Sequence, residues 1–217
     1  DQPTPPEVID SLQSAIHRRE NHGYPSFWGK PQVREAIARF YRRQYDVELD
    51  PHSEVAVFQG SHIGIGGIPR ALLSPGQYLI STDPCYPIYR SAALQSQAAF
   101  YGLPLRAENH FLPDFNDLPR EVADKAGLVV LNYPHNPTGA LATPARDAQG
   151  TFFLWLGVPP GYRSQEFARL LLQEAHILVA PGTGFGAGGE GFIRISLTAG
   201  DEALSNALDR LARLALF

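Results

Sequence analysis

Between residues 54 and 134 the chain alternates short apolar runs with helix-like stretches, and this alternation most constrains what it can fold into. The apolar runs are EVAVF (54–58), QYLIS (77–81), AAFYGLPL (98–105) and GLVVLNYP (127–134). The stretches between them are SHIGIGGIPRALL (61–73), PIYRSAALQS (87–96) and DLPREVADK (117–125). Strands separated by helices in this way predict a parallel sheet covered on both faces. The first part of the chain is therefore predicted to be α/β.

The pattern changes after Arg146. Apolar runs at 151–158, 176–182 and 191–199 are accompanied by helical stretches at 164–175 and 201–217. The last two runs have no helix between them, which predicts some antiparallel pairing in a small α+β domain. We predict a domain division into an arm at 1–30, a partial α/β domain at 31–145 and a C-terminal domain at 146–217.

Composition excludes several classes of protein. Hydrophobic residues make up 44% and charged residues 18% of the 217, which is typical of a globular chain. A net charge of -4 without a basic stripe argues against nucleic acid or an anionic membrane as partner. The single cysteine, Cys85, excludes an internal disulfide and a cysteine-based zinc site. A cytoplasmic setting, without a membrane span, is expected.

A glycine-rich stretch, GTGFGAGGEG (182–191), contains a G-x-G-x-x-G match at Gly184, Gly186 and Gly189. A dinucleotide site would need a helix to follow, so that its N-terminus faces the phosphates. The next segment, FIRISL, is β-branched and strand-like. The pattern therefore favours a flexible loop over a nucleotide site.

Two segments follow predicted strands and place polar or aromatic groups at their ends. In QGSHIGIGG, Ser61 and His62 open a helix and could bind an anion, although an ordinary turn with Ser61 as N-cap explains them equally. In DPCYPIY, Tyr86 could stack on a planar ligand or simply be packed. The histidines, His62 and His135 included, lack metal-ligand spacing and are interpreted as surface or capping residues.

Two further residues carry groups suited to a ligand with oxygen atoms. Asn136, in NPTG, precedes a proline, so its amide can point away from its own backbone and donate to a ligand. The alternative is an ordinary turn. Arg194, in GFIRISLT, could hold a carboxylate with two hydrogen bonds, but an exposed strand arginine would look the same.

In this order and spacing, these segments resemble the fold-type-I aminotransferases, which use pyridoxal 5'-phosphate (PLP). The likeness is greatest to the branch that contains LL-diaminopimelate aminotransferase. It covers almost the whole chain and is carried by DQPTPPEVID, ENHGYPSFWGKPQVREAIARFY, EVAVFQGSHIG, LSPGQYLISTDPCYPIY, FLPDFNDLP, NYPHNPTG and the stretch from GTFFLWLGV to GFIRISLT. The resemblance implies a PLP-dependent transferase-like fold with a partial PLP-binding domain at 31–145.

The resemblance also implies a role for each matching residue. Ser61 and His62 would bind the PLP phosphate, and Tyr24 would reach the phosphate of the neighbouring subunit in a homodimer. Tyr86 would stack on the pyridine ring and Asn136 would donate to the ring's 3-oxygen. Arg194 matches the family's arginine that would bind the substrate α-carboxylate.

Two residues of the family's site have no match. After the NPTG turn the family continues through strands that bring an aspartate to the pyridine nitrogen and the Schiff-base lysine to the cofactor. Between Gly139 and Thr151 there is no room for these strands. Lys30 and Lys125 are the only lysines, and neither matches the catalytic position. No catalytic residue is therefore predicted, and the chain is expected to be catalytically incomplete and truncated internally.

The predicted function is PLP-dependent transfer of an amino group between an amino acid and a 2-oxo acid, with amino-acid biosynthesis as its context. Two alternatives remain. One is a shortened, non-catalytic paralogue that acts as a binding or dimerisation protein. The other is a C–S lyase or decarboxylase of the same fold. No metal is expected.

Overall fold

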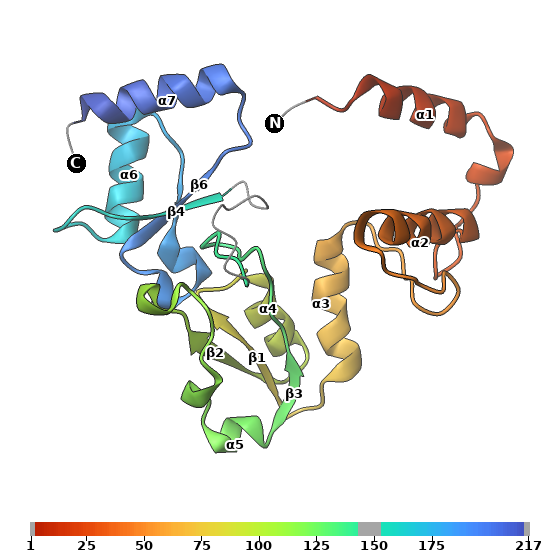
Figure 1. Cartoon of the computed structure of the whole chain (residues 1–217), viewed down its shortest axis with the longest axis horizontal. Helices are drawn as coiled ribbons and strands as arrows, with labels where there is room; N and C mark the ends of the chain where they lie inside the picture. Colours follow the sequence, from red (N-terminus) through yellow and green to blue (C-terminus); the bar gives the residue numbers. More distant parts are fainter. Residues whose placement is uncertain (1–2, 143–152, 215–217) are drawn as a thin grey trace. The chain divides into compact units, whose positions relative to one another are not determined.

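The structure, a computed structural model, describes residues 3–142 and 153–214. Figure 1 shows the elements in chain order. The α-helices are α1 (Pro6–Ile16), α2 (Pro31–Tyr45), α3 (Ser61–Leu72), α4 (Ile88–Gln95), α5 (Arg120–Ala123), α6 (Ser164–Ala175) and α7 (Asp201–Arg213). The strands are β1 (Tyr78–Asp83), β2 (Ala99–Pro104), β3 (Ala126–Val129), β4 (Phe153–Gly157), β5 (Ala180–Pro181) and β6 (Phe192–Ser196). Short 3₁₀ turns are η1 (Arg19–Asn21), η2 (Ala107–Asn109), η3 (Phe115–Asp117), η4 (Gly182–Phe185) and η5 (Ala187–Gly189).

The chain divides into two compact units. One comprises Pro3–Gly64 and the other runs from Ile65 through the C-terminal helix. The first contains α1, η1 and α2, and the second contains both sheets. Our three-part domain division remains a prediction.

The first sheet is parallel, with strand order β2-β1-β3. Tyr78 lies opposite Ala99 of β2 and Ala126 of β3, so the strands start at the same edge. Helix α4 packs against β1 and β2, as a strand–helix–strand connection requires. The predicted α/β class is confirmed.

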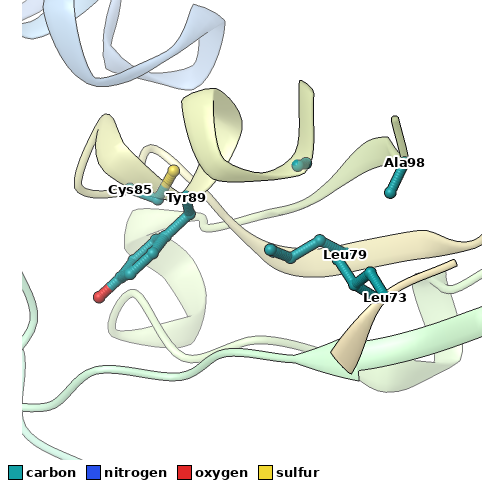
Figure 2. Packing of buried hydrophobic residues seen from close by; sticks show 6 residues of the cluster. Leu73, Leu79, Cys85, Tyr89 and Ala98 are labelled. Carbon is teal, nitrogen blue, oxygen red and sulfur yellow. The ribbon is translucent and has the colours of Figure 1, made fainter. Parts of the chain in front are cut away.

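The central strand of this sheet, β1, is buried on both faces. Leu79 belongs to a cluster with Leu73, Cys85, Tyr89, Ala93 and Ala98 (Figure 2). The next residue, Ile80, belongs to a second cluster with Leu103 and Val122. Because successive side chains of a strand point to opposite faces, β1 supplies both cores. The near-continuous apolar run of β1 follows from this double burial, whereas the edge strand β3 is largely exposed.

The second sheet is antiparallel, with order β4-β6-β5. Its core contains Phe167 and Leu171 of α6 together with Val179 and Ile193, and α7 packs against α6. Glu166 caps α6 by accepting a hydrogen bond from the Arg163 backbone N–H at 3.2 Å. The antiparallel pairing predicted for this part is confirmed.

One strand prediction, at 54–58, was wrong, and those at 127–134 and 176–182 were too long, the former because β3 ends at Val129. Residues 54–58 form no strand in the described structure, because the run has no neighbouring strand with which to pair and only Val55 of it is buried. The strand predicted at 176–182 is reduced to Ala180–Pro181, since residues 176–179 close helix α6 and supply Val179 to the core instead. Apolar composition cannot distinguish a strand that pairs in a sheet from an extended segment that buries only one of its side chains.

Candidate functional site

The site is built at the carboxyl edge of the parallel sheet. Strand β1 ends at Asp83 and leads into the turn that carries Tyr86, and β3 leads toward the NPTG turn that carries Asn136. Parallel strands end at one edge, which is where ligands of open α/β sheets bind. The Ser81 hydroxyl donates to the Val130 carbonyl oxygen at 2.9 Å and holds the two strand ends together.

The NPTG turn is closed by its own backbone. The His135 N–H donates to the Ala140 carbonyl oxygen at 2.8 Å, and the Gly139 N–H donates to the His135 carbonyl oxygen at 2.7 Å. Gly139 has a φ of 74°, a left-handed conformation that glycine adopts without strain. Asn136 therefore lies at the tip of a fixed turn.

Arg194 of β6 reaches this turn. Its Nη1 donates to Asn136 Oδ1 at 3.0 Å. The guanidinium carbon lies 3.9 Å from the Phe153 ring centroid and 4.7 Å from that of Phe185. Burial lowers the pKa of Arg194, and the nearby phenol of Tyr86 opposes that shift. The guanidinium nevertheless remains a cation at neutral pH, because arginine titrates far above it.

The Arg194 Nε is buried and has no hydrogen-bond partner among residues 3–142 and 153–214. An unpaired buried donor costs about 1–3 kcal/mol, and the same holds for Nε of Arg34 and Arg90 and for Nε1 of Trp155. A carboxylate could accept from Nε and from the neighbouring guanidinium nitrogen at once.

Asp83 fixes the C-terminal strands to the end of β1. Its Oδ1 accepts from the Gly188 N–H at 3.1 Å, and its Oδ2 pairs with Arg90 Nη2 at 3.0 Å. The Cys85 N–H also donates to the Phe185 carbonyl oxygen at 2.9 Å. These contacts hold the loop before β6 against the turn that carries Tyr86, and so bring Arg194 to the parallel sheet.

The glycine-rich stretch serves this contact. A Cβ added at Gly182 would overlap the backbone of Gly189, and one at Gly188 would lie 2.8 Å from the Asp83 carbonyl oxygen. No helix follows the stretch; β6 does, as predicted. The interpretation as a flexible loop needs correction, because η4 and η5 are packed turns whose glycines allow two backbones to approach.

His135 is not a surface or capping residue, contrary to the sequence interpretation. Its side chain is 2% exposed and lies between Thr82 and Thr138. The residue lies between β3 and the NPTG turn at the carboxyl edge of the sheet, where this turn and the end of β1 cover it. Burial lowers its pKa from 6.5 to about 4.

The predicted site residues fall into two groups. Tyr86, Asn136 and Arg194 come together within the second unit. Ser61 and His62 open α3 and, with Tyr24, belong to residues 3–64; Tyr24 is fully exposed. Their roles toward a phosphate remain predictions.

The contacts of both lysines are defined within their own units. Lys30 Nζ donates to the Glu20 carbonyl oxygen and to Asn21 Oδ1, each at 2.6 Å. The Lys125 carbonyl oxygen accepts from the Tyr78 N–H at 2.9 Å, which places Lys125 at the amino end of the parallel strands. The site lies at the opposite, carboxyl end.

Sequence reasoning missed Asp83 and the two phenylalanines around Arg194. The sequence did contain a signal for Asp83, because this residue follows a predicted strand directly before the turn that carries Tyr86. Phe153 and Phe185 carried no local signal, because their relation to Arg194 depends on the pairing of β4 with β6 and on the fold of η4.

Two classes of site are not found within the described ranges. No group of three or more His, Cys, Asp or Glu side chains there could hold a metal ion. No helix in that part of the chain is long and apolar enough to cross a membrane. Burial raises the pKa of the Cys85 thiol to about 11, so the thiol is a protonated core residue rather than a nucleophile.

The parallel sheet covered by helices, with an antiparallel C-terminal part, is the fold of a fold-type-I aminotransferase. The comparison with protein families agrees: the family described as aminotransferase class I and II matches residues 1–146 and 144–211. The chain belongs to this family.

Individual relatives support the assignment. The chain is 28% identical to LL-diaminopimelate aminotransferase of Aquifex aeolicus, with 100% of this chain and 89% of the relative covered. It is 42% identical to transaminase BacF of Bacillus subtilis over 70% of this chain and 38% of the relative. Among solved structures, substrate-bound BacF has a TM-score of 0.92 at 25% identity, covering 100% of this chain and 88% of that one. An aminotransferase from Staphylococcus aureus has a TM-score of 0.93 at 26% identity, with coverage of 99% and 91%.

The alignment with the Aquifex protein is longer than the chain itself. It spans 346 positions against 217 residues here, so about 129 positions of the relative have no counterpart in this sequence. The two family matches meet at residues 144–146, within the stretch where the sequence pattern changes. That stretch, including Thr143–Gln149, lies outside the described residues.

Proposed function

We propose that this chain serves PLP-dependent transfer of an amino group between an amino acid and a 2-oxo acid. The observation that carries the proposal is the contact between Asn136 and Arg194 beside Tyr86, assembled from three segments far apart in the sequence. Family membership and the likeness to solved aminotransferases support the same reaction class.

The residues fit the substrate and the cofactor ring. Arg194 would bind the α-carboxylate, because its unpaired buried Nε needs an acceptor and its aromatic surroundings strengthen the ion pair by excluding water. Asn136 accepts from Arg194 through Oδ1, which leaves its Nδ2 to donate to the cofactor's ring oxygen. Tyr86 would lie against the ring face.

The phosphate of PLP would lie at the turn that opens α3. Backbone N–H groups at the start of a helix favour an anion, and Ser61 adds a hydroxyl there. When bound, PLP supplies the electron sink into which the electrons of a broken α-carbon bond can pass. The chain's own residues bind the ring and the carboxylate and so fix which α-carbon bond faces the ring.

We propose that the chain lacks the amine nucleophile and the ring-nitrogen aspartate. Lys30 is held by Glu20 and Asn21, and Lys125 lies at the amino end of the sheet. The relatives' additional positions, about 129 in the Aquifex protein, are where these two residues would lie. The 217-residue chain alone is therefore expected not to turn over.

Assembly as a homodimer in the cytoplasm completes the proposal. Tyr24 is fully exposed in residues 3–64 and would meet the phosphate bound by the partner subunit. The apolar sides of α1 and α2 are also exposed, as expected of helices that a second copy covers. The names of the relatives, LL-diaminopimelate aminotransferase among them, suggest a role in amino-acid biosynthesis.

The test measures binding to the purified 217-residue chain. A 2-oxo acid is titrated by calorimetry, and Arg194→Ala is expected to weaken its binding at least tenfold, since the ionic hydrogen bonds are lost. Arg169→Ala, an exposed arginine of α6, is the matched control and should leave binding unchanged. Equal binding by wild type and Arg194→Ala would contradict the proposed role of Arg194.

A second measurement concerns PLP itself. PLP is titrated by absorbance, and Asn136→Ala is expected to weaken its binding about tenfold. Borohydride treatment followed by intact mass should leave the 23.8 kDa chain without a site-specific covalent adduct. An adduct at one lysine, or turnover by the chain alone, would show that Lys30 or Lys125 acts as the amine.

A non-catalytic role for this chain is the second candidate, and the placement of the two lysines is the observation that favours it. In that case the chain would bind PLP or carboxylates, or pair with another subunit, without catalysis. Turnover by the purified chain would exclude it. Absence of turnover together with Arg194-dependent carboxylate binding would fit both candidates, and an added segment that bears the lysine would then separate them by restoring activity.

A further inference from the structure

The buried imidazole of His135 connects two turns that are more than fifty residues apart. His135 Nε2 lies 3.0 Å from Thr82 Oγ1, and His135 Nδ1 lies 2.8 Å from Thr138 Oγ1. Thr82 lies at the end of β1, before the turn that carries Tyr86. Thr138 belongs to the turn that carries Asn136.

The hydrogen bonds on either side of the imidazole determine which of these polar atoms donates and which accepts. The Thr82 hydroxyl donates to the Pro84 carbonyl oxygen at 3.0 Å, so it must accept from His135, which places the imidazole proton on Nε2. His135 Nδ1 then accepts from the Thr138 hydroxyl. Thr138 Oγ1 in turn accepts from the Ala140 N–H at 3.3 Å. Every donor has one acceptor, so the chain of hydrogen bonds has a single direction.

We propose that His135 is a positioning residue that fixes Asn136 relative to Tyr86. It does so by joining the Thr82–Tyr86 turn to the NPTG turn through one neutral, fully hydrogen-bonded imidazole. The inference rests on the proposed function, in which Asn136 and Tyr86 act on one cofactor ring. A ring's face and its oxygen are at a fixed separation, so two turns that move independently would bind it poorly.

The local contacts of Asn136 explain why an outside support is needed. Its own backbone N–H reaches Asn132 Oδ1 at 3.4 Å, which is a long hydrogen bond. Its side chain is held by Arg194, which would also serve the substrate. The position of the turn itself therefore depends on His135 and on the backbone bonds that close residues 135–140.

The first test needs no cofactor. The side-chain amide resonances of Asn136 are followed by ¹H–¹⁵N NMR in the 217-residue chain, assigned by their loss in Asn136→Asp. Thr82→Val and Thr138→Val each remove one hydroxyl without changing shape and are expected to shift or broaden these resonances. Thr82→Ser and Thr138→Ser keep the hydroxyl and should restore them. The amide of Asn109, which donates to the Leu112 carbonyl oxygen at 3.0 Å, is the internal control and should not move.

The second test measures two ligands on the same variants. PLP is expected to bind about tenfold more weakly to Thr82→Val, Thr138→Val and His135→Asn. Inorganic phosphate alone should bind these variants as it binds wild type, because it does not use Asn136 or Tyr86. His176→Asn is the matched histidine control: His176 is exposed with a φ of 54°, which asparagine tolerates.

The outcomes separate this inference from the proposed function. Unchanged Asn136 resonances in folded Thr82→Val and Thr138→Val would overturn the positioning role, as would an equal loss of PLP and phosphate binding through general loss of structure. Shifted resonances with Ser rescue, in a wild-type chain that binds no PLP, would uphold the positioning of Asn136 and contradict the cofactor instead. Shifted resonances with selective loss of PLP would support both.

Discussion

Residues 3–64 and the unit that follows them differ in how much apolar surface they bury. Within the described part of the first, Val55 is the one buried hydrophobic side chain, and apolar residues of α1 such as Leu12 are exposed. The second unit encloses two faces of a parallel sheet and a separate core beneath the antiparallel one. Amphipathic sequence therefore produces helices in both units, but it is the second unit that buries apolar side chains of helices such as α4 and α6.

This difference matters for the proposed site. Arg194, Asn136 and His135 lie in the unit whose cores hold their turns in place. Ser61, His62 and Tyr24 lie in the part that buries little. The residues proposed to bind the ring and the carboxylate are thus held by the cores of their own unit, whereas the proposed phosphate contacts would depend on whatever covers residues 3–64. A second copy is our proposal for that cover.

The largest expected effect comes from removing a core side chain of the second unit. Phe167 is 1% exposed, and Phe167→Ala should lower the free energy of unfolding by about 3–5 kcal/mol through lost burial and the cavity left behind. Leu12→Ala, at a position 68% exposed, should change it by less than about 0.5 kcal/mol in the monomer. Urea unfolding of both variants measures this. A Leu12→Ala cost that rises with protein concentration would show that association covers α1.

Acid should weaken the second unit through His135. The pKa of His135 is about 4 in the folded protein against 6.5 for a free histidine, so the unfolded chain takes up the proton first. Stability from this group is complete above pH 6.5 and is lost as the pH falls toward about 4, by about 3 kcal/mol in all. Urea midpoints between pH 7 and 4 measure the loss, and His135→Gln should remove this part of it. If the urea midpoint of His135→Gln fell with pH as steeply as that of the wild type, other groups would be the cause of the acid sensitivity.

A smaller effect is expected where two backbones touch. Gly182→Ala would place a methyl group into the backbone of Gly189 and should destabilise the protein by about 1–3 kcal/mol. Gly23→Ala, in residues 3–64, has no atom within 4 Å of the new methyl group and should be close to neutral. Thermal unfolding of the pair measures the difference. Equal midpoints would show that η4 and η5 are not packed as tightly as described.

Local pattern was sufficient to predict most elements. The helix at 164–175 was predicted with its observed bounds from its helix-like sequence alone, and the structure adds the cap by Glu166. The strand expected at 54–58 failed, since its apolar residues resemble a strand while no described neighbour pairs with it. Strand formation depends on a partner, and the partner is not encoded in the run itself.

The candidate site was predictable only in part for the same reason. Tyr86, Asn136 and Arg194 each follow or lie on a strand, which local pattern can recognise. That Arg194 donates to Asn136, that Phe153 and Phe185 enclose it and that Asp83 holds Gly188 depend on contacts between distant segments. His135 was misread because nothing in its immediate neighbours indicates burial.

The sequence by itself determined the α/β class, the antiparallel C-terminal part, the family and the absence of a lysine other than Lys30 and Lys125. These follow from periodicity, motif order and residue identity, which are local properties of the chain. Only the tertiary structure decided that the Nε of the half-buried Arg194 is enclosed and unpaired within the described residues and that His135 joins two turns. Burial and hydrogen-bond pairing depend on contacts between segments that are distant in the sequence, and only the folded chain brings those segments together.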